Sequence, residues 1–263
     1  MNPFLVSRIV TVHYLRRAAC LFFILFLLNV ITVNAQKSLA DEISSIDTNV
    51  DLELILAVDC SYSVDQQEYA LQMSGIADAL RTLEVQYAIQ SGKHQRIAVS
   101  LIQWSSTNSQ TVALPWMTIG SPQSIELAAR SIEQLERRTP IGPTSISAVI
   151  AKSLHLFESS PYEAQRKVID ISGDGRNNDG VPPQYLRDVA IKKGITINGL
   201  AIENEVSTLR YYFRNQIIGG QGSFVIKANS YNSYKQAILE KLVREIGSMP
   251  VVMLPIDDHI LVR

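Results

Sequence analysis

The sequence predicts an α/β fold, with a doubly wound, mostly parallel central sheet, helices on both faces and one antiparallel edge strand. Short apolar runs of strand length alternate along the chain with longer segments whose apolar residues recur every three or four positions. Strands that alternate with helices form parallel sheets, because each helix carries the chain back to the same end of the sheet. One pair of neighbouring strands has no helix between its members, which predicts the antiparallel edge.

The predicted strands are short apolar or alternating runs bounded by polar or glycine-rich segments. They lie at residues 53–59, 96–104, 111–117, 167–172, 195–202 and 222–226. The second and third are separated only by the polar segment 105–110, which predicts a hairpin. The glycine-rich segment 219–222 is expected to form a turn before the last strand rather than a phosphate-binding loop.

The predicted helices have apolar side chains along one face. They lie at residues 65–87, 121–135, 144–157, 182–193, 206–217 and 234–246. The first is expected to be continuous, because its apolar spacing runs unbroken from Tyr69 to Tyr87. Ser121-Pro122 is a typical helix start, with serine as the cap and proline in the first turn. Gly247 is a typical C-cap for the last helix.

The first 35 residues predict a secretory signal peptide, cleaved after Ala35. Three arginines precede the apolar segment 18–33, which is shorter than the ~20 residues of a membrane-spanning helix. An uncleaved membrane anchor is the alternative. A periplasmic or secreted location is therefore expected, with this organisation: signal peptide 1–35, polar lead-in 36–51, domain 52–247, and a tail 248–263 that is either an added strand or disordered.

Charge and cysteine content exclude several classes of partner. Cleavage leaves 21 of the 24 basic residues against 25 acidic ones, with no basic patch, so nucleic acid and anionic membranes are unsuitable partners. No later segment approaches membrane-spanning length, which predicts no stable membrane insertion after cleavage.

After cleavage Cys60 remains as a single cysteine and cannot form an intramolecular disulfide. A buried, inert thiol is favoured over a redox sensor.

An acidic side chain and two hydroxyls follow the first predicted strand at every second position, in Asp59, Ser61 and Ser63. In extended backbone such positions point to the same side, so three oxygens converge beyond the strand. Oxygen ligands suit a hard divalent cation. The alternative role for these three side chains is to cap a helix that begins near residue 65.

Two further oxygen-bearing residues stand at expected ends of helices or strands. Thr144 begins a predicted helix and Asp174 follows a predicted strand within Gly173-Asp174-Gly175. The carboxyl ends of parallel strands share one edge of the sheet, so these loops are expected to meet the loop after Asp59. Taken singly, Thr144 is also a plausible N-cap and Asp174 a plausible turn residue.

On these motifs the chain resembles von Willebrand factor A domains over residues 52–247, with a complete metal-ion-dependent adhesion site. The resemblance implies these ligands: Asp59, Ser61 and Ser63 in the first loop, Thr144 in the second, and Asp174 in the third, largely through a water. In that family the ion is usually Mg²⁺, with Mn²⁺ or Ca²⁺ as alternatives. The chain is most similar to a bacterial group of exported A-domain-like proteins that share the Ser-Gly-Asp-Gly third loop. It departs from many A domains at Pro143 and Gly173, which affects partner preference more than metal binding.

The resemblance implies an exported, metal-dependent protein-binding module of the adhesion or scaffold type, not an enzyme. A partner protein would supply an Asp or Glu carboxylate to the ion. The chain has no nucleophile elbow, zinc-protease helix or phosphate-binding Gly-Lys-Ser/Thr motif. Two alternatives stay open: a metal-assisted hydrolase, which needs a general base near the ion, and a structural domain with a vestigial metal site.

Overall fold

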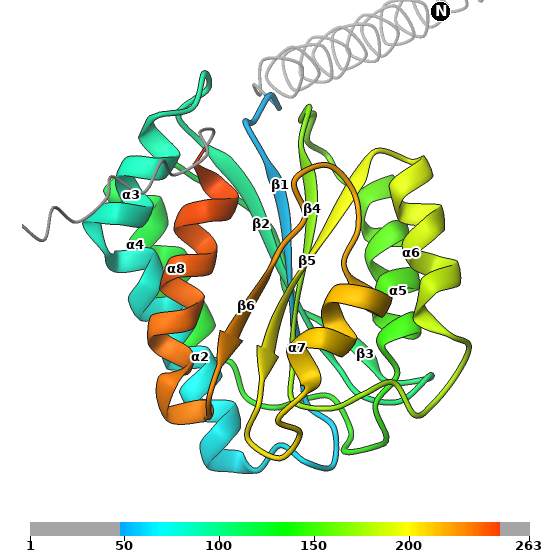
Figure 1. The fold of residues 1–263 in the computed structure, drawn as a ribbon. Coiled ribbons are helices and arrows are strands. Elements are labelled where there is room, and N and C mark those ends of the chain that lie inside the picture. Colours follow the sequence, from blue (N-terminus) through cyan, green and yellow to red (C-terminus); the bar gives the residue numbers. More distant parts are fainter. Residues whose placement is uncertain (1–47, 248–263) are drawn as a thin grey trace, which may run out of the picture. The chain divides into compact units, whose positions relative to one another are not determined.

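The computed structural model describes residues 48–247, and these form one layered α/β domain (Figure 1). The strands of this part are β1 (Glu53–Asp59), β2 (Ile97–Trp104), β3 (Gln110–Ile119), β4 (Lys167–Gly173), β5 (Ile195–Ile202) and β6 (Val225–Ala228). They form a six-stranded sheet in the order β3-β2-β1-β4-β5-β6. β3 runs antiparallel to β2 and every other pair is parallel, which confirms the predicted fold class.

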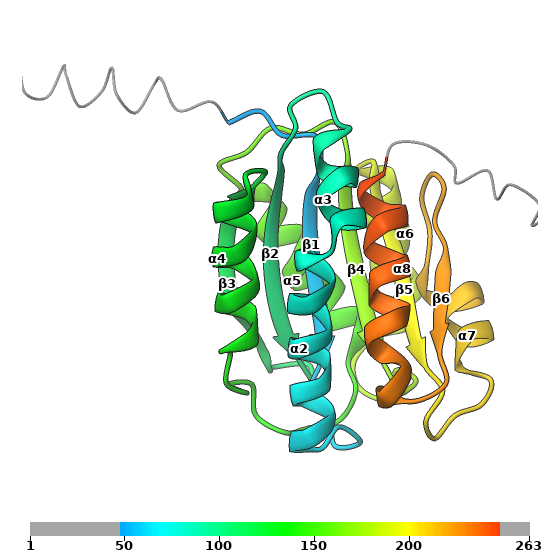
Figure 2. The ribbon, with the colours of Figure 1, turned by 90° about the vertical axis from the view of Figure 1, so that its left-hand side faces the viewer.

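Helices cover both faces of the sheet (Figures 1 and 2). Their bounds are α2 (Gln66–Arg81), α3 (Leu83–Gln90), α4 (Pro122–Glu133), α5 (Ile146–Glu158), α6 (Pro183–Lys192), α7 (Leu209–Tyr212) with a π-helical turn at Phe213–Ile217, and α8 (Tyr234–Ile246) after a 3-10 turn at Tyr231–Ser233. α2, α3, α4 and α8 lie on one face, and α5, α6 and α7 on the other. The sheet therefore separates two apolar cores.

β1 is a central strand, and the five residues between Glu53 and Asp59 are all apolar because both faces of the strand are covered. All seven of its residues are buried. Alternate side chains enter the two cores: Leu54, Leu56 and Val58 pack under α2 and α8, and Ile55 and Ala57 pack under α5. This central position carries Asp59 to the middle of the carboxyl edge of the sheet.

The two edges of the sheet differ in build. β3 forms one edge; its exposed Pro115 has no amide hydrogen, and its pairing with β2 is irregular on both sides of Leu101. β6 forms the other edge and has four residues. β3 is longer than the predicted strand 111–117, and β6 begins later than the predicted 222–226, because Gly220 and Gly222 adopt positive φ in a turn.

The predicted continuous helix at 65–87 is wrong. Thr82 has extended backbone (φ −70°, ψ 150°), ends α2 and caps α3, its side chain accepting a hydrogen bond from the amide of Val85. The break rotates α3 about its axis relative to α2. Leu83 and Tyr87 are therefore 79% and 82% exposed, although they continue the apolar spacing of α2. The predicted helix at 206–217 is likewise shorter, since regular α-helix begins only at Leu209.

Several predictions concern residues outside the described range. The signal peptide, most of the polar lead-in and the tail from residue 248 belong to this group. Within residues 48–247, every helix is too short or too polar to cross a membrane.

Candidate metal centre

Three loops meet at the carboxyl edge of the sheet, at the lower end of the strands in Figure 1. The first follows β1, the second precedes α5, and the third follows β4. β1 pairs directly with β4, with Val58 opposite Ser172, so the first and third loops leave the sheet side by side. The second loop is held against the first by the amide of Tyr62, which donates to the carbonyl of Gly142 at 2.9 Å.

Asp59 presents one oxygen that the surrounding protein leaves unpaired. The residue is fully buried, and its Oδ1 accepts a hydrogen bond from the amide of Ser61 at 2.7 Å. Its Oδ2 is buried without a hydrogen-bond partner among the described residues. Burial raises the pKa of Asp59 to about 7, and the charge of Asp174 adds to the rise. A buried carboxylate with a free oxygen is the arrangement that a bound cation stabilises.

Asp174 is held on both of its carboxylate oxygens. Ser63 Oγ donates to Oδ1 at 2.6 Å, and the Tyr231 hydroxyl donates to Oδ2 at 3.0 Å. Ser61 Oγ lies 3.3 Å from Ser63 Oγ, so the two hydroxyls of the first loop are neighbours. Burial raises the pKa of Asp174, while the hydrogen bonds from Ser63 and Tyr231 oppose the rise.

Thr144 completes the group of predicted ligands from the second loop. Its amide donates to Asn178 Oδ1 at 2.8 Å, and its carbonyl accepts from the Asn178 amide at 2.9 Å. A Cβ atom added to Gly175 would lie 3.3 Å from Thr144 Oγ1. The third loop thus passes directly over Thr144, and a larger residue at position 175 would crowd its hydroxyl.

Glycine also allows a close approach at position 173. A Cβ atom there would lie 2.9 Å from Asp59 Oδ2, which is closer than such contacts normally permit. Gly173, which departs from many A domains, thus leaves the free oxygen of Asp59 open. The structure thus brings Ser61, Ser63 and Asp174 together, and it sets Gly173 against Asp59 and Gly175 against Thr144.

The capping alternatives are wrong. Asp65 caps α2: its Oδ1 accepts from the Glu68 amide at 2.8 Å, and Glu68 accepts from the Asp65 amide at 2.9 Å. The side chains of Asp59, Ser61 and Ser63 therefore have no part in starting that helix. Thr144 precedes the N-cap position of α5, which is Ser145. Asn177 Oδ1 instead accepts from the first amides of α5.

The donor set is made of oxygen atoms, mostly hydroxyls. Within residues 48–247 no cluster of three or more His, Cys, Asp and Glu side chains could hold a metal. A cation here would therefore depend on one or two carboxylates together with serine and threonine hydroxyls. Such ligands fit Mg²⁺, Mn²⁺ or Ca²⁺ better than metals that prefer sulfur or imidazole.

Three supporting residues were missed by the sequence analysis: Tyr231, Asn178 and Arg137. The Arg137 guanidinium donates to the carbonyls of Cys60, of Ser61 at 3.1 Å and of Val64 at 2.7 Å, and so fixes the first loop. Arg137 and Tyr231 lie far along the chain from the groups they hold, so no local spacing signals their role.

Cys60 faces the core beneath α2, as predicted. Its side chain is fully buried, and burial raises the pKa of the thiol to about 12. A thiol in this state is inert rather than redox-active.

Solved structures with this fold are von Willebrand factor A domains. Proximal thread matrix protein 1 from the mussel byssus is 18% identical, with a TM-score of 0.55 over 75% of this chain and 48% of that chain. A von Willebrand factor type A protein from Catenulispora acidiphila is 16% identical, with a TM-score of 0.53 over 76% of this chain and 43% of that one. This chain thus spans a little under half the length of each of these two structures, and the likeness shows the fold.

A further structure of the mussel protein is described as having a zinc-occupied MIDAS motif. It is 17% identical, with a TM-score of 0.51 over 75% of this chain and 48% of that chain. No protein with a curated description matches the chain. A family described as "Protein of unknown function (DUF1194)" matches residues 49–250, which is most of the chain. The chain therefore belongs to the DUF1194 family and has a von Willebrand factor A fold.

Proposed function

We propose that this protein is an exported, metal-dependent protein-binding module. Asp59, Ser61, Ser63 and Thr144 hold a divalent cation, Mg²⁺ in the first place, and Asp174 acts largely through a water. A carboxylate from a partner protein completes the coordination of the ion. The observation that carries the proposal is the buried, unpaired Oδ2 of Asp59, at the start of the loop in which the Ser61 and Ser63 hydroxyls are neighbours.

The electrostatics of the site support an incoming anion. Asp59 is the one charged group among the direct ligands, so the cation keeps much of its charge. Asp174 is already engaged by Ser63 and Tyr231, which suits a residue that contacts the ion through water. The zinc-occupied motif of the mussel protein gives a precedent for a cation in this fold.

The hydrolase alternative needs a general base beside the ion. The two histidines of the described part lie elsewhere: the amide of His94 bonds to Asp51 at the amino end of β1, and His155 pairs with Glu158 on the surface of α5. The binding function therefore fits the site better than catalysis. The structural alternative, with a vestigial site, predicts no response to cations at all.

The organisation of the chain remains part of the proposal. Residues 1–35 are a signal peptide cleaved after Ala35, residues 36–51 a lead-in, residues 52–247 the binding domain, and 248–263 a tail. The module would act in the periplasm or outside the cell, where its partner is another protein of the envelope.

Thermal unfolding in EDTA and in millimolar Mg²⁺, Mn²⁺ or Ca²⁺ tests the metal site. A cation present at about 100 times its Kd adds about 2.7 kcal/mol of stability, which corresponds to a rise in Tm of roughly 5–10 °C for a domain of this size. Asp59→Ala should abolish the cation-dependent rise. Asp179→Ala is the matched control, because this nearby carboxylate bonds to the Thr107 amide instead. A Tm unmoved by every cation would refute the metal site and favour the structural alternative.

A further inference from the structure

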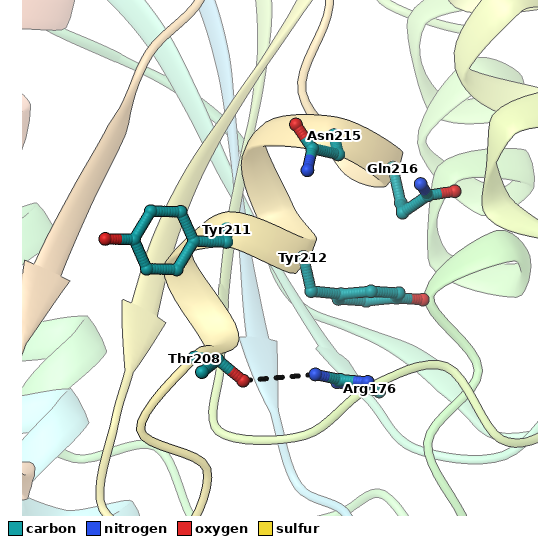
Figure 3. Close-up of a pocket in the computed structure, with 6 residues that line it drawn as sticks. All are labelled: Arg176, Thr208, Tyr211, Tyr212, Asn215 and Gln216. Atoms are coloured by element: carbon teal, nitrogen blue, oxygen red, sulfur yellow. Dashed lines mark hydrogen bonds between the residues drawn. The ribbon is translucent and has the colours of Figure 1, made fainter.

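A shallow pocket of about 250 Å³ lies beside the proposed metal site. It is lined by Arg176, Thr208, Tyr211, Tyr212, Asn215 and Gln216 (Figure 3). The last five recur at spacings of three and four, so they form one face of α7 and its π-helical turn. Figure 3 shows Arg176 and Thr208 at one end of this face, Asn215 and Gln216 at the other, and Tyr212 between them.

Arg176 is held in place yet has no acidic partner. Its Nη2 donates to Thr208 Oγ1 at 3.1 Å, and its guanidinium lies 5.5 Å from the centre of the Tyr212 ring. That ring is fixed in turn, because the Tyr212 hydroxyl accepts from the Asn177 amide at 3.2 Å. No carboxylate in the described part of the chain forms an ion pair with Arg176, whereas Arg187 nearby pairs with Asp188 at 2.8 Å.

The pocket adjoins the metal site through the chain itself. Arg176 follows Asp174 by two residues, with Gly175 between them. Since a Cβ on Gly175 would lie 3.3 Å from Thr144 Oγ1, the Cα of Arg176 is within about 9 Å of that hydroxyl, given about 3.8 Å between consecutive Cα atoms. A ligand bound at the ion therefore reaches Arg176 with a short extension.

We propose that this pocket binds a second acidic side chain of the same partner segment, three residues from the acid that coordinates the ion. The inference rests on the proposed function and names the partner's chemistry. A guanidinium presents paired N–H donors that match a carboxylate, and the Asn215 and Gln216 carboxamides add donors along the same wall. An extended peptide advances about 3.3 Å per residue, so three residues span about 10 Å, which is comparable with the bound of about 9 Å from the Thr144 hydroxyl to the Arg176 Cα.

Two blocked synthetic peptides test this inference: Gly-Gly-Asp-Gly-Gly-Gly-Gly, with one acid, and Gly-Gly-Asp-Gly-Gly-Asp-Gly, with two. Their affinities are measured by NMR titration of the protein in Mg²⁺ and in EDTA. In Mg²⁺ the two-acid peptide should bind about fivefold more tightly, as expected for a positioned surface ion pair. The side-chain amide signals of Asn215 and Gln216 should move with that peptide alone.

Arg176→Gln should reduce this advantage to the factor of about two that two equivalent carboxylates give by statistics, a difference of RT ln 2. The one-acid peptide should keep its affinity, which shows that the variant is folded and its metal site intact. Arg214→Gln is the matched control, because this exposed arginine lies on the same segment but not in the pocket. It should bind like the wild type.

Each other result has one meaning. Two peptides of equal affinity in the wild type, or an advantage that survives Arg176→Gln, would overturn the inference about the pocket while leaving the metal site standing. Absence of Mg²⁺-dependent binding for both peptides would overturn the proposed function, and the pocket inference with it.

Discussion

Lys241 is a buried cation on α8, set between two carboxylates, and its replacement by methionine should destabilise the protein by about 3–5 kcal/mol. Its Nζ lies 2.6 Å from Asp170 Oδ1 on β4 and 2.5 Å from Glu245 Oε1 on α8. With an effective dielectric constant of about 20, an ionised pair at such a distance is worth about 6 kcal/mol in gross attraction. Desolvation of the buried charges offsets most of this gain, so the contacts add little net stability when complete.

Removal of the lysine leaves both carboxylates buried without a cation. Burial and the neighbouring charge of Asp170 raise the pKa of Glu245 to about 8, although Lys241 acts to lower it. In Lys241→Met that pKa rises further, so the folded protein holds a proton that the unfolded chain releases above pH 4.5. Stability of the variant should therefore fall as pH rises from 5 to 8. The folded wild type also holds the Glu245 proton up to about pH 8 and should fall in parallel, so the loss caused by the substitution should be similar at the two pH values.

Urea unfolding followed by circular dichroism at both pH values measures the effect. Lys235→Met is the matched control, because this lysine lies on the same helix but pairs with Asp78 at the surface; its loss should stay below about 1 kcal/mol. The triple variant Asp170→Asn, Lys241→Met, Glu245→Gln should regain most of the lost stability, since it carries no buried charge at these positions. A loss below 1 kcal/mol for Lys241→Met, or one confined to a single pH value, would refute the reasoning.

Three further predictions concern the first loop and its surroundings. Without divalent cations, the stability of the wild type should fall between pH 5 and 8 by about 2 kcal/mol more than that of Asp59→Asn, because the pKa of Asp59 is raised in the folded protein. Urea unfolding at several pH values measures this difference, and equal pH dependence of the two proteins would contradict it. Gly173→Ala should weaken Mg²⁺ binding at least about tenfold in thermal-shift titrations, because its Cβ would displace Asp59 Oδ2; unchanged affinity would argue against that oxygen as a ligand. Cys60 should resist alkylation at pH 8 until the protein is unfolded, as mass spectrometry would reveal, and rapid labelling of the native protein would exclude a buried thiol.

The four inner strands were predicted closely from the sequence because each is a buried, mainly apolar run with a clear boundary, whereas the partly buried edge strands β3 and β6 departed from their predicted bounds. β1 and β5 have the predicted bounds. Parallel topology also brings the loops after β1 and β4 together, as the contact between Ser63 and Asp174 shows. These features follow from the pattern of apolar residues and from the geometry of parallel sheets, and both can be inferred from the sequence.

The break at Thr82 could not be predicted from apolar spacing alone. Leu83 and Tyr87 fit the period of the preceding helix, yet Val85 and Ile89 are the residues of α3 that pack into the core. The sequence does not distinguish a threonine that caps a helix from one inside a helix. Tertiary packing decides which of the two positions Thr82 occupies. The partners of the candidate ligands escaped prediction for a related reason: Tyr231 stands 57 residues from Asp174, and only the folded chain joins them.

The proline in β3 has a consequence for how this protein meets other molecules. An open sheet edge can recruit a strand from another chain, and this is a common route to both partner binding and aggregation. At Pro115 the outer edge lacks a donor, and the irregular pairing beside Leu101 disturbs the ladder further. The opposite edge, β6, is four residues long and carries the charged Lys227. Recognition through addition of a backbone strand is therefore disfavoured at both edges of the sheet.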